Sequence, residues 1–306
     1  MKKTIITGNK GFVGLNLQEY LHKKDKVIIG VSRTPLVNEL HYKNLSLDRL
    51  NQSKSFIHLA GKAHDLKNTS DDAVYFEVNT ELTKTLFDQF LKSDCEVFMY
   101  MSSVKAAADQ VEEILTEEII PNPVTVYGKS KLAAENYILS KEIPEGKRVY
   151  ILRPCMIHGP NNKGNLNLLY SFVSKGIPYP FGKYHNKRSF VSVENLCFII
   201  NELIENRNVK SGIYNVADNQ PLSTNNLVSI IGKVMGKSAK IYKIPKTIVV
   251  FIAKIGDFLP LPVNSERLQK LTENYVVSNL KIRKAIGKEL PYASKQGLIK
   301  TFQSFN

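Results

Sequence analysis

The sequence predicts an α/β protein, with a doubly wound parallel sheet followed by a smaller C-terminal domain. Short buried apolar runs alternate with amphipathic helical segments, the first run ends in a glycine-rich turn, and small residues follow later runs. Strands joined by helices lie parallel, because each helix returns the chain to the same edge of the sheet. The 306 residues, 43% of them hydrophobic, are enough for one large or two modest domains.

The first apolar run, residues 3–7, continues into a glycine-rich turn and then an amphipathic helix. Gly8 permits the tight turn, Gly11 lets the backbone approach a pyrophosphate, and Gly14 lets the helix pack closely on the strand. The N-terminus of the helix supplies N–H groups to the phosphates. A purely structural turn is the alternative. The pattern favours a dinucleotide site formed by Gly8, Lys10, Gly11, Phe12, Val13 and Gly14.

The second strand, residues 26–31, is followed by Ser32 and Arg33. A site selective for NAD usually has an acidic residue at this place, where it holds the ribose hydroxyls. Its absence, with a guanidinium adjacent, tilts the expected cofactor from NAD toward NADP. Arg33 is otherwise an ordinary solvated charge at the end of a strand.

The third strand, residues 55–59, ends at Leu59, Ala60 and Gly61, where cofactors lie in open α/β sheets. We interpret His58 as a packed core residue, since no second metal-type ligand lies nearby, and we predict no metal site. A helix over residues 71–92 and a buried strand over 96–101 follow. That strand ends at Ser102 and Ser103, so Ser103 is expected on the same edge of the sheet as the glycine turn.

Tyr127 and Lys131 are four residues apart in a segment that reads as a helix from Lys129 onward. Residues at this spacing share a helix face. An ammonium group near a tyrosine lowers the pKa of the phenol, which makes Tyr127 a candidate acid–base group. The pair alone also fits a surface tyrosine beside a solvated lysine.

Composition limits the other function classes. The formal net charge is +14, but the lysines are spread along the chain and form no nucleic-acid motif, so we expect anionic metabolites and no nucleic acid as ligands. Three dispersed cysteines, no leader sequence and no apolar run of 18 residues predict a cytoplasmic protein without a transmembrane segment.

Five motifs in register resemble the extended short-chain dehydrogenase/reductases, in the branch of nucleotide-sugar epimerases and dehydratases. They are Thr7-Gly8-x-x-Gly11-x-x-Gly14, His58-Leu59-Ala60-Gly61, Ser102-Ser103, Tyr127-Gly128-Lys129-Ser130-Lys131 and Leu152-Arg153-Pro154. The resemblance implies a Rossmann domain and a catalytic triad of Ser103, Tyr127 and Lys131. Tyr127 would exchange the proton of a sugar hydroxyl, Lys131 would hold the nicotinamide ribose, and Ser103 would hydrogen-bond the reacting oxygen. It also implies that Pro154 contacts the cofactor.

The departures from the family pattern narrow the reaction. Relatives that eliminate water carry an Asp-Glu pair after the catalytic serine, whereas this chain has Val104 and Lys105. The sequence most resembles bacterial enzymes that act at C4 of UDP-N-acetylhexosamines in surface-polysaccharide precursor synthesis. These are 4-epimerases, which remove and return a hydride at C4, and 4-keto reductases, where Tyr127 would protonate the alkoxide. The residues do not separate the two reactions, so NAD and NADP both remain open.

The predicted domains are residues 1–165, with a later contribution from about 187–217, and residues 166–306, which mainly bind substrate. By resemblance, Asn165 and Arg188 would contact the nucleotide diphosphate, with Lys105, Ser103 and Tyr127 also in contact with the UDP-sugar. Alternatively, Arg188 is a strand-end charge. We also expect a homodimer.

Residues 245–255 are apolar around most of a helix. We favour a helix buried in the small domain or in a subunit contact. The alternative is a helix in peripheral contact with a membrane, with Lys246 and Lys254 facing the headgroups. For the whole chain, the competing hypothesis is a non-catalytic Rossmann protein that senses NAD(P) or binds RNA, which would have no need of a serine, tyrosine and lysine in register.

Overall fold

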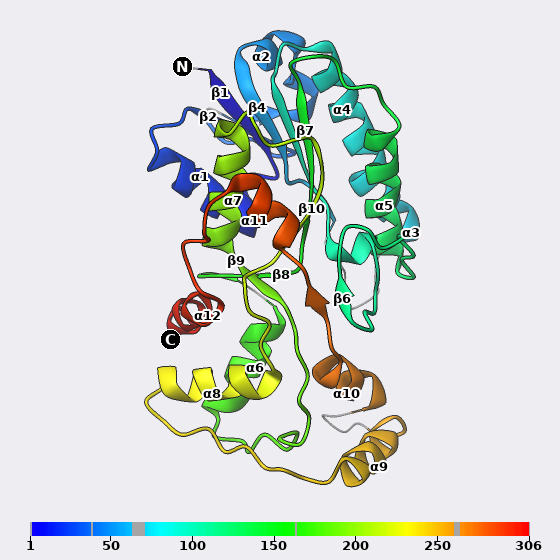
Figure 1. The fold of residues 1–306 in the computed structure, drawn as a ribbon, viewed down its shortest axis with the longest axis vertical. Coiled ribbons are helices and arrows are strands. Elements are labelled where there is room, and N and C mark those ends of the chain that lie inside the picture. Colours follow the sequence, from blue (N-terminus) through cyan, green and yellow to red (C-terminus); the bar gives the residue numbers. More distant parts are fainter. Residues whose placement is uncertain (1, 38, 63–70, 163, 260–263, 306) are drawn as a thin grey trace.

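A seven-stranded parallel sheet forms the centre of the larger lobe (Figure 1). The computed structural model describes residues 2–37, 39–62, 71–162, 164–259 and 264–305. The strand order is β10-β7-β5-β4-β1-β2-β3, so the chain starts in the middle and builds outward in both directions. The strands are β1 (Lys3–Thr7), β2 (Ile28–Ser32), β3 (Leu40–His41), β4 (Ser53–His58), β5 (Val97–Met101), β7 (Arg148–Pro154) and β10 (Gly212–Val216).

Helices cover both faces of this sheet. One face packs against α1 (Phe12–His22), α7 (Val193–Glu205) and α11 (Leu280–Ile286). The opposite face packs against α2 (Leu47–Asn51), α4 (Leu82–Lys92) and α5 (Val126–Leu139). The connections also contain η1 (Tyr42–Asn44), α3 (Asp72–Phe76), the π-helical turn η2 (Glu77–Glu81) and η3 (Val104–Ala106). The predicted doubly wound α/β fold is confirmed.

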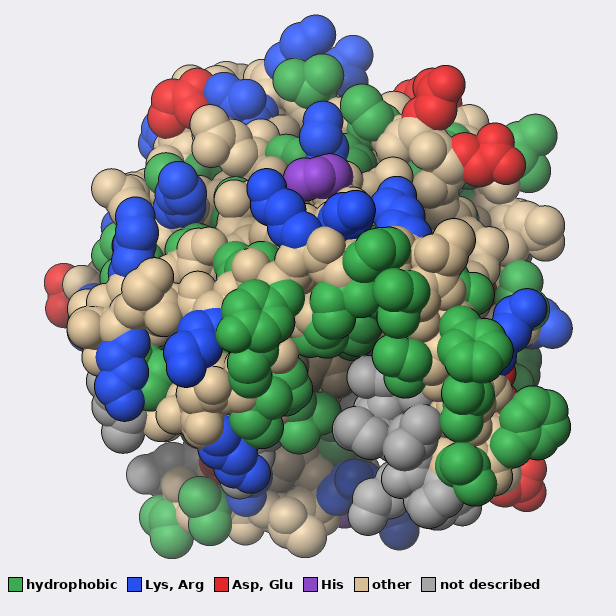
Figure 2. All heavy atoms as spheres, turned by 90° about the horizontal axis from the view of Figure 1, so that it is seen from below, with side chains coloured by type: hydrophobic (Ala, Val, Ile, Leu, Met, Phe, Trp, Pro, Cys, Tyr) green, Lys and Arg blue, Asp and Glu red, His purple; other side chains and the backbone are tan. Residues whose placement is uncertain are grey.

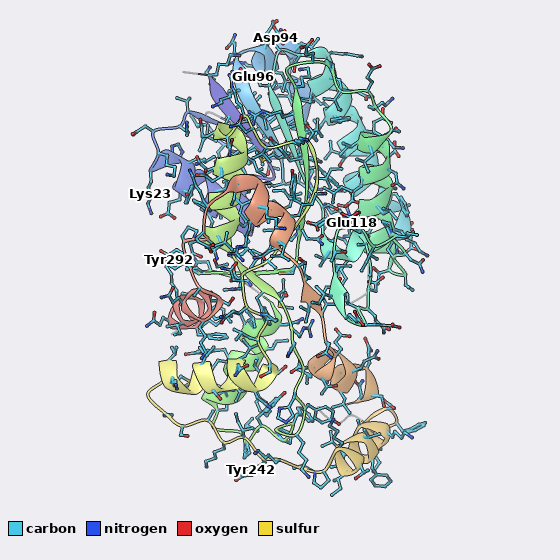
Figure 3. All side chains as sticks on the ribbon, in the orientation of Figure 1. Lys23, Asp94, Glu96, Glu118, Tyr242 and Tyr292 are labelled. Carbon is cyan, nitrogen blue, oxygen red and sulfur yellow. The ribbon has the colours of Figure 1, made fainter. Side chains whose placement is uncertain are left out.

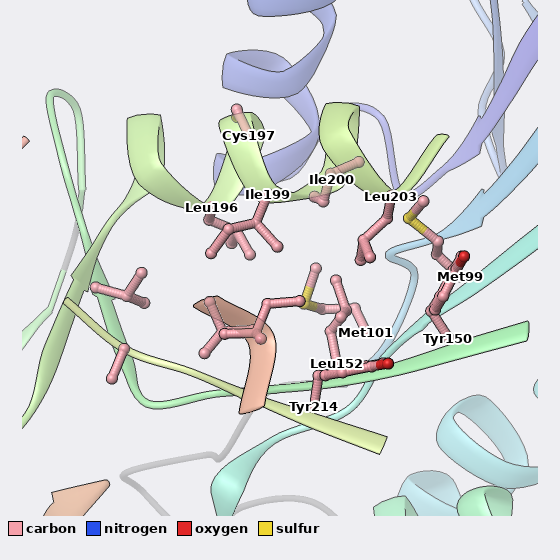
Figure 4. Close-up of a cluster of buried hydrophobic side chains, with 14 of the residues drawn as sticks. Met99, Met101, Tyr150, Leu152, Leu196, Cys197, Ile199, Ile200, Leu203 and Tyr214 are labelled. Atoms are coloured by element: carbon pink, nitrogen blue, oxygen red, sulfur yellow. The ribbon is translucent and has the colours of Figure 1, made fainter. Parts of the chain in front are cut away.

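Side chains alternate along the strands between the two cores. On β5, Met99 and Met101 point into the core under α7, which Figure 4 shows, while Phe98 and Tyr100 point into the core under α4 and α5. This period of two is what a strand that is buried on both faces requires. The ends of the strands are therefore fixed in register, and their carboxyl ends form one common edge.

The smaller lobe is mainly helical and lies below the sheet in Figure 1. Around one apolar cluster pack α6 (Asn165–Ser174), α8 (Thr224–Val234) and α12 (Ser294–Gln303). A second cluster joins α8 to α9 (Lys246–Gly256) and α10 (Ser265–Thr272). Two parallel strand pairs connect segments that are distant in sequence, namely β8 (Met156–His158) with β9 (Phe190–Ser192) and β6 (Ile114–Leu115) with β11 (Val276–Val277).

Some element boundaries differ from the expectations. Helix α5 begins at Val126, earlier than the expected Lys129, because the Thr125 hydroxyl accepts a hydrogen bond from the Gly128 N–H at 3.2 Å and so caps the helix. The strand expected over 187–193 is limited to Phe190–Ser192, and Val193 already belongs to α7. Among the residues that the structure describes, no helix has the length and apolar character needed to cross a membrane.

Candidate active site

The glycine turn after β1 has the geometry of a phosphate cradle. Gly8 has a φ of +67°, and a Cβ on it would lie 2.7 Å from the Ala60 backbone nitrogen. Gly11 is the N-cap of α1, and no side chain in the described part of the chain caps this helix. Its first N–H groups are therefore available to an anion, as a dinucleotide pyrophosphate requires. The residues present fit the cofactor.

Gly14 has a different part in the same turn. A Cβ on Gly14 would lie 2.4 Å from the Gly8 carbonyl oxygen and 2.6 Å from the Asn9 Cα. Gly14 thus allows a close approach of α1, as the sequence predicts. At this point, however, the helix approaches the backbone of the turn instead of the strand. Gly14 shapes the loop, and Gly11 lies at the exposed mouth of it.

His58 is a core residue, as interpreted from the sequence. It is fully buried, its Nδ1 lies 2.7 Å from the Thr7 hydroxyl, and its Nε2 lies 2.9 Å from the Thr83 hydroxyl. Burial, with the charge of Lys131 nearby, lowers the pKa of His58 to about 3. The imidazole is therefore neutral and ties β1, β4 and α4 together at the cofactor edge. The described residues contain no group of three or more metal-ligating side chains.

Lys131 lies in a buried site at the end of β5. Its Nζ donates to the Met101 carbonyl oxygen at 2.8 Å and lies 4.9 Å from the centroid of the Tyr100 ring. A Cβ on Gly61 would lie 2.9 Å from this Nζ, so the glycine at the end of β4 makes room for the ammonium. Burial lowers the pKa of Lys131 to about 8, although the Glu135 carboxylate opposes this shift. The structure thus brings Lys131 and Gly61 together.

Burial of the Lys131 ammonium lowers the free energy of unfolding by an amount that can be measured. In the unfolded chain Lys131 titrates near 10.5, so between pH 8 and 10.5 the unfolded state binds more protons and stability rises with pH. Below pH 8 the penalty is on the order of 3 kcal/mol, from about 1.4 kcal/mol per pKa unit. We expect Lys131→Met to stabilise the cofactor-free protein at pH 7 and to flatten this rise, as measured by urea unfolding. The control is Lys129→Met, an exposed residue on the same helix. If Lys131→Met lowered the free energy of unfolding and left its dependence on pH unchanged, the assignment of a buried ammonium with a lowered pKa would be contradicted.

Tyr127 is paired with Ser103. Burial raises the pKa of the Tyr127 phenol, and its hydrogen bond with the Ser103 hydroxyl opposes this rise. The expectation that the Lys131 ammonium lowers this pKa is wrong for the structure, because the ammonium binds the Met101 carbonyl and lies against Tyr100. Tyr127 and Lys131 are nevertheless on α5, one turn apart, and Ser103 is the second residue after β5. The three residues of the predicted triad thus lie at the carboxyl edge of the sheet.

Two side chains, those of Asp109 and Asn79, hold the first turns of α5. Both carboxylate oxygens of Asp109 are used, one accepting from the Val124 and Thr125 N–H groups at 2.6 and 3.0 Å and the other from the Thr125 hydroxyl. Asn79, in the π-helical turn η2, donates to the Ser130 hydroxyl at 3.0 Å. Nothing in the sequence pattern indicated either residue, because both contacts join segments that are distant in sequence.

A buried ion pair lies behind the triad. Arg153 Nε donates to both carboxylate oxygens of Glu135, at 3.0 and 3.1 Å, and the Ser102 hydroxyl donates to the same carboxylate. Both charged residues are at most 1% exposed. Removing one partner of such a pair leaves an uncompensated buried charge, so the pair fixes α5 against β7. Glu135 is four residues after Lys131, a spacing that places it on the same face and could have identified it.

Arg33 lies close to the glycine turn. Burial raises the pKa of Tyr42, which a hydrogen bond with the Gly8 backbone and the charge of Arg33 both oppose. The guanidinium is exposed and follows β2 directly. Lys10, in the turn itself, donates to the Thr34 carbonyl oxygen. Two cations therefore flank the end of β2, where the adenosine ribose of a dinucleotide lies.

Glu39 supplies a carboxylate that the sequence analysis missed. Glu39 is in the segment before β3, and its side chain lies near the end of β2. Its oxygens accept from Asn9 Nδ2 at 2.6 Å and from the Leu36 N–H at 2.8 Å, and they lie 3.2 Å from Lys10 Nζ. Although burial raises the pKa of Glu39, these hydrogen bonds hold it below its ordinary value. An acidic residue thus lies near the place where β2 itself provides none.

The predicted substrate residues Lys105 and Arg188 belong to one cluster around Tyr275. Lys105 Nζ lies 4.4 Å from the centroid of the Tyr275 ring, and the Lys105 N–H donates to the Ser103 hydroxyl at 3.2 Å. The Arg188 N–H bonds to Leu222, and its guanidinium lies 3.6 Å from the Glu273 carboxylate. The charge of Arg188 also acts on the Tyr275 phenol. The cluster links the triad to the smaller lobe. No local pattern in the sequence indicated Tyr275 or Glu273.

The remaining predicted residues lie at ends of elements. Leu59, Ala60 and Gly61 follow β4, and Pro154 ends β7, which places them on the same edge as the glycine turn. Phe12 and Val13 begin α1. Asn165 is the first residue of α6 and is exposed, and none of the contacts described above connects it to Tyr127 or Arg188.

The fold and this edge define an extended short-chain dehydrogenase/reductase that uses NAD(P). The model of the family described as NAD dependent epimerase/dehydratase matches residues 4–217. The chain belongs to this family. It is 29% identical to a UDP-glucose 4-epimerase of Vibrio cholerae over 319 residues, covering 99% of this chain and 95% of that protein.

Two further similarities extend this result. The chain is 28% identical to a GDP-6-deoxy-D-mannose reductase of Pseudomonas aeruginosa over 264 residues, which is 80% of this chain and 84% of that protein. Its fold resembles that of MoeE5 in complex with UDP-glucose and NAD, with a TM-score of 0.76 and 19% identity, covering 99% of this chain and 98% of the other. A nucleotide-sugar epimerase and a nucleotide-sugar reductase are thus both among the similar proteins.

Proposed function

We propose that this protein catalyses oxidoreduction at C4 of a UDP-sugar, as a 4-epimerase or a 4-keto reductase, and that the sugar is an N-acetylhexosamine. Its place would be the synthesis of bacterial surface-polysaccharide precursors. The observation that carries the proposal is the Ser103–Tyr127 hydrogen bond beside the buried Lys131, at the edge that also holds the glycine turn. The similarity to a UDP-glucose 4-epimerase and to a nucleotide-sugar reductase supports it.

Each residue has a separate part in this chemistry. The nicotinamide supplies or accepts the hydride when it is bound. Tyr127 moves the proton of the C4 oxygen, and Ser103 orients that oxygen and the phenol through its hydroxyl. Lys131 would hold the nicotinamide ribose and favour the phenolate during turnover. The 3.2 Å hydrogen bond from the Lys105 N–H keeps the Ser103 side chain in place.

Dehydration is disfavoured by the residue after Ser103. Val104 is 4% exposed and packs in the core under α7, so its side chain has no proton to give and does not reach a substrate. Elimination of water needs an acid for the leaving hydroxyl. Interconversion of hydroxyl and ketone at C4 needs none beyond Tyr127, which supports epimerisation or reduction.

Arg188 is proposed to bind the substrate diphosphate. We expect Arg188→Ala to raise KM for the UDP-sugar by about ten- to a hundredfold with little change in kcat, because a hydrogen bond to a charged group is worth roughly 1.5–3 kcal/mol. Glu273→Gln should lower KM, since the carboxylate competes with the diphosphate. The control is Arg283→Ala, which removes another paired arginine. A loss in kcat alone would contradict this role.

Cofactor choice is the finer part of the proposal. We propose that Arg33 and Lys10 bind the 2′-phosphate of NADP. Arg33→Ala should then weaken NADP binding about ten- to a hundredfold, from roughly 1.5–3 kcal/mol, and leave NAD nearly unchanged. Glu39→Gln, which removes a negative charge from the same place, should strengthen NADP binding. Titration calorimetry of the cofactor-free protein measures both. Equal effects of either substitution on the two nucleotides would reject this pairing.

Incubation with UDP-N-acetylglucosamine and with UDP-glucose, followed by NMR of the sugar, tests the proposed reaction. The nucleotide that copurifies separates its two forms, because an epimerase retains its cofactor between turnovers. Tightly held NAD would favour the epimerase, and free exchange of NADPH would favour the reductase. The expected homodimer stays a prediction, which sedimentation equilibrium can test.

A further inference from the structure

Helix α9 has two apolar faces, and among the residues that the structure describes only one of them is packed in the core. Val249 and Ala253 are one turn apart, are 4% and 1% exposed, and lie in the core of the smaller lobe with Tyr179 and Phe181. This pair anchors the helix. The small domain therefore buries one side of this helix, and the expected alternative of a subunit contact stays a prediction.

A second apolar stripe runs along the solvent side of α9. Ile248, Phe251, Ile252 and Ile255 recur at the i, i+3, i+4 and i+7 spacing of one helix face. Phe251, on the side away from the anchoring pair, is 65% exposed, and Ile248 and Ile252 are 48% and 44% exposed. Isolated apolar residues are common on surfaces, whereas a continuous stripe of this kind indicates a contact with something else.

The stripe continues past the end of the helix. The N–H groups of Phe258 and Leu259 donate to the Ile255 carbonyl oxygen at 3.1 and 3.0 Å. These hydrogen bonds continue the helical turn beyond the end of α9. Phe258 is 89% exposed. Asp257 accepts from the N–H and hydroxyl of Ser265, at 2.8 and 2.6 Å, which fixes this turn against α10. The apolar side chains are thus held in an ordered frame.

Cations accompany the stripe at this end of the molecule. Lys254 is exposed on α9 and Lys243 on the segment before it, which also carries the half-exposed Tyr242 (Figure 3). Lys246 is on the anchored side of the helix, where its Nζ lies 5.2 Å from the centroid of the Tyr184 ring. Figure 2 shows this underside, where apolar side chains gather beside lysine and arginine side chains and acidic ones lie at the margins. Long apolar side chains with lysines beside them, and a formal net charge of +14, complement an anionic lipid surface.

We infer that this face, defined by Ile248, Phe251, Ile252, Ile255 and Phe258 with Lys243 and Lys254, docks on an anionic lipid bilayer. The apolar stripe would enter the headgroup boundary, and the lysines would bind the lipid phosphates. A second copy of the chain would bury the stripe but would oppose lysines to lysines across a symmetric contact. The inference is independent of which sugar the enzyme takes.

Vesicle flotation tests the docking with the full-length protein. The native protein should float with vesicles of phosphatidylglycerol and phosphatidylcholine, and much less with phosphatidylcholine alone or at high salt. The double variant Phe251→Ser/Ile252→Ser should lose about tenfold or more in vesicle affinity, and so should Lys243→Gln/Lys254→Gln. All these side chains are exposed, so the unfolding midpoint and turnover of a soluble UDP-sugar should be unchanged.

Matched controls replace equally exposed residues on the larger lobe. Leu15→Ser/Leu139→Ser removes two apolar side chains that are 56% and 54% exposed, and Lys24→Gln/Lys92→Gln removes two lysines; neither should affect flotation. The inference is overturned if the native protein fails to bind anionic vesicles, or if the α9 variants bind as well as the controls. It is also overturned if the α9 variants, without lipid, dissociate a dimer in sedimentation, which would assign this face to a second copy of the chain.

Discussion

Tyr127→Phe is expected to reduce turnover by roughly a hundred- to ten-thousandfold, the usual contribution of a positioned acid–base group. The ring keeps its place on α5, so the unfolding midpoint and the cofactor affinity should stay close to those of the native protein. The loss should appear in kcat. Ser103→Ala should be milder, because water can partly replace the hydroxyl that bonds the phenol.

The pH profile separates the role of Lys131 from that of Tyr127. Burial raises the pKa of Tyr127 in the cofactor-free structure, so any help from Lys131 must come while the substrate complex is formed. Residual activity of Lys131→Met should therefore shift toward higher pH, where the phenol ionises without the ammonium. A control is Tyr137→Phe on the same helix, whose hydroxyl bonds Asp88 away from the triad. Wild-type turnover in Tyr127→Phe would refute the catalytic assignment.

Gly11→Val is expected to reduce cofactor affinity by about a hundredfold or more while the fold survives. The Gly11 backbone, with φ −75° and ψ 169°, is open to any residue, so a side chain adds no backbone strain. Its Cβ would lie 3.2 Å from the Gly8 carbonyl oxygen, at the mouth of the turn where the pyrophosphate must approach. Losing about two hydrogen bonds to a charged group costs roughly 3–6 kcal/mol.

The control places the same side chain in an equivalent backbone far from the turn. Ala293 is the exposed N-cap of α12, with φ −68° and ψ 149°, and Ala293→Val should leave cofactor binding unchanged. Gly14→Ala should instead lower the unfolding midpoint, since its Cβ would meet the turn backbone at 2.4 Å. Titration of NAD and NADP, together with the unfolding midpoint, distinguishes the three variants. Near-native affinity in Gly11→Val would show that the cofactor lies elsewhere.

Local pattern was sufficient to predict the sheet and to place Ser103, Tyr127 and Lys131 at one edge of it. The glycine turn, the buried strands and the Tyr127–Lys131 spacing are each readable over a few residues, and the parallel sheet then places their ends on one edge. Glu135 could have been found in the same way, from its position one turn after Lys131. These features depend on neighbours in sequence.

The rest depends on contacts between segments distant in sequence. Glu39 reaches the cofactor edge only because β3 pairs with β2, and Tyr275 reaches Lys105 only because the smaller lobe folds back. The pKa of Tyr127 was mispredicted for a similar reason, because the Met101 carbonyl that holds Lys131 comes from β5. The two faces of α9 read alike in sequence, and only packing shows which one is buried.

The most direct test follows the hydrogen at C4. UDP-N-acetylglucosamine and UDP-glucose carrying deuterium at C4 are incubated with the native protein and with NAD or NADP, and NMR locates the label. We predict that the native protein moves the label from C4 to the nicotinamide. In a 4-keto reductase run in reverse the label stays on the nicotinamide, whereas in a 4-epimerase it returns to the opposite face of C4. Tyr127→Phe should do so at least a hundredfold more slowly. Retention of both the label and the original configuration at C4 of both sugars with the native protein, or a label that moves equally fast in Tyr127→Phe, would contradict this account.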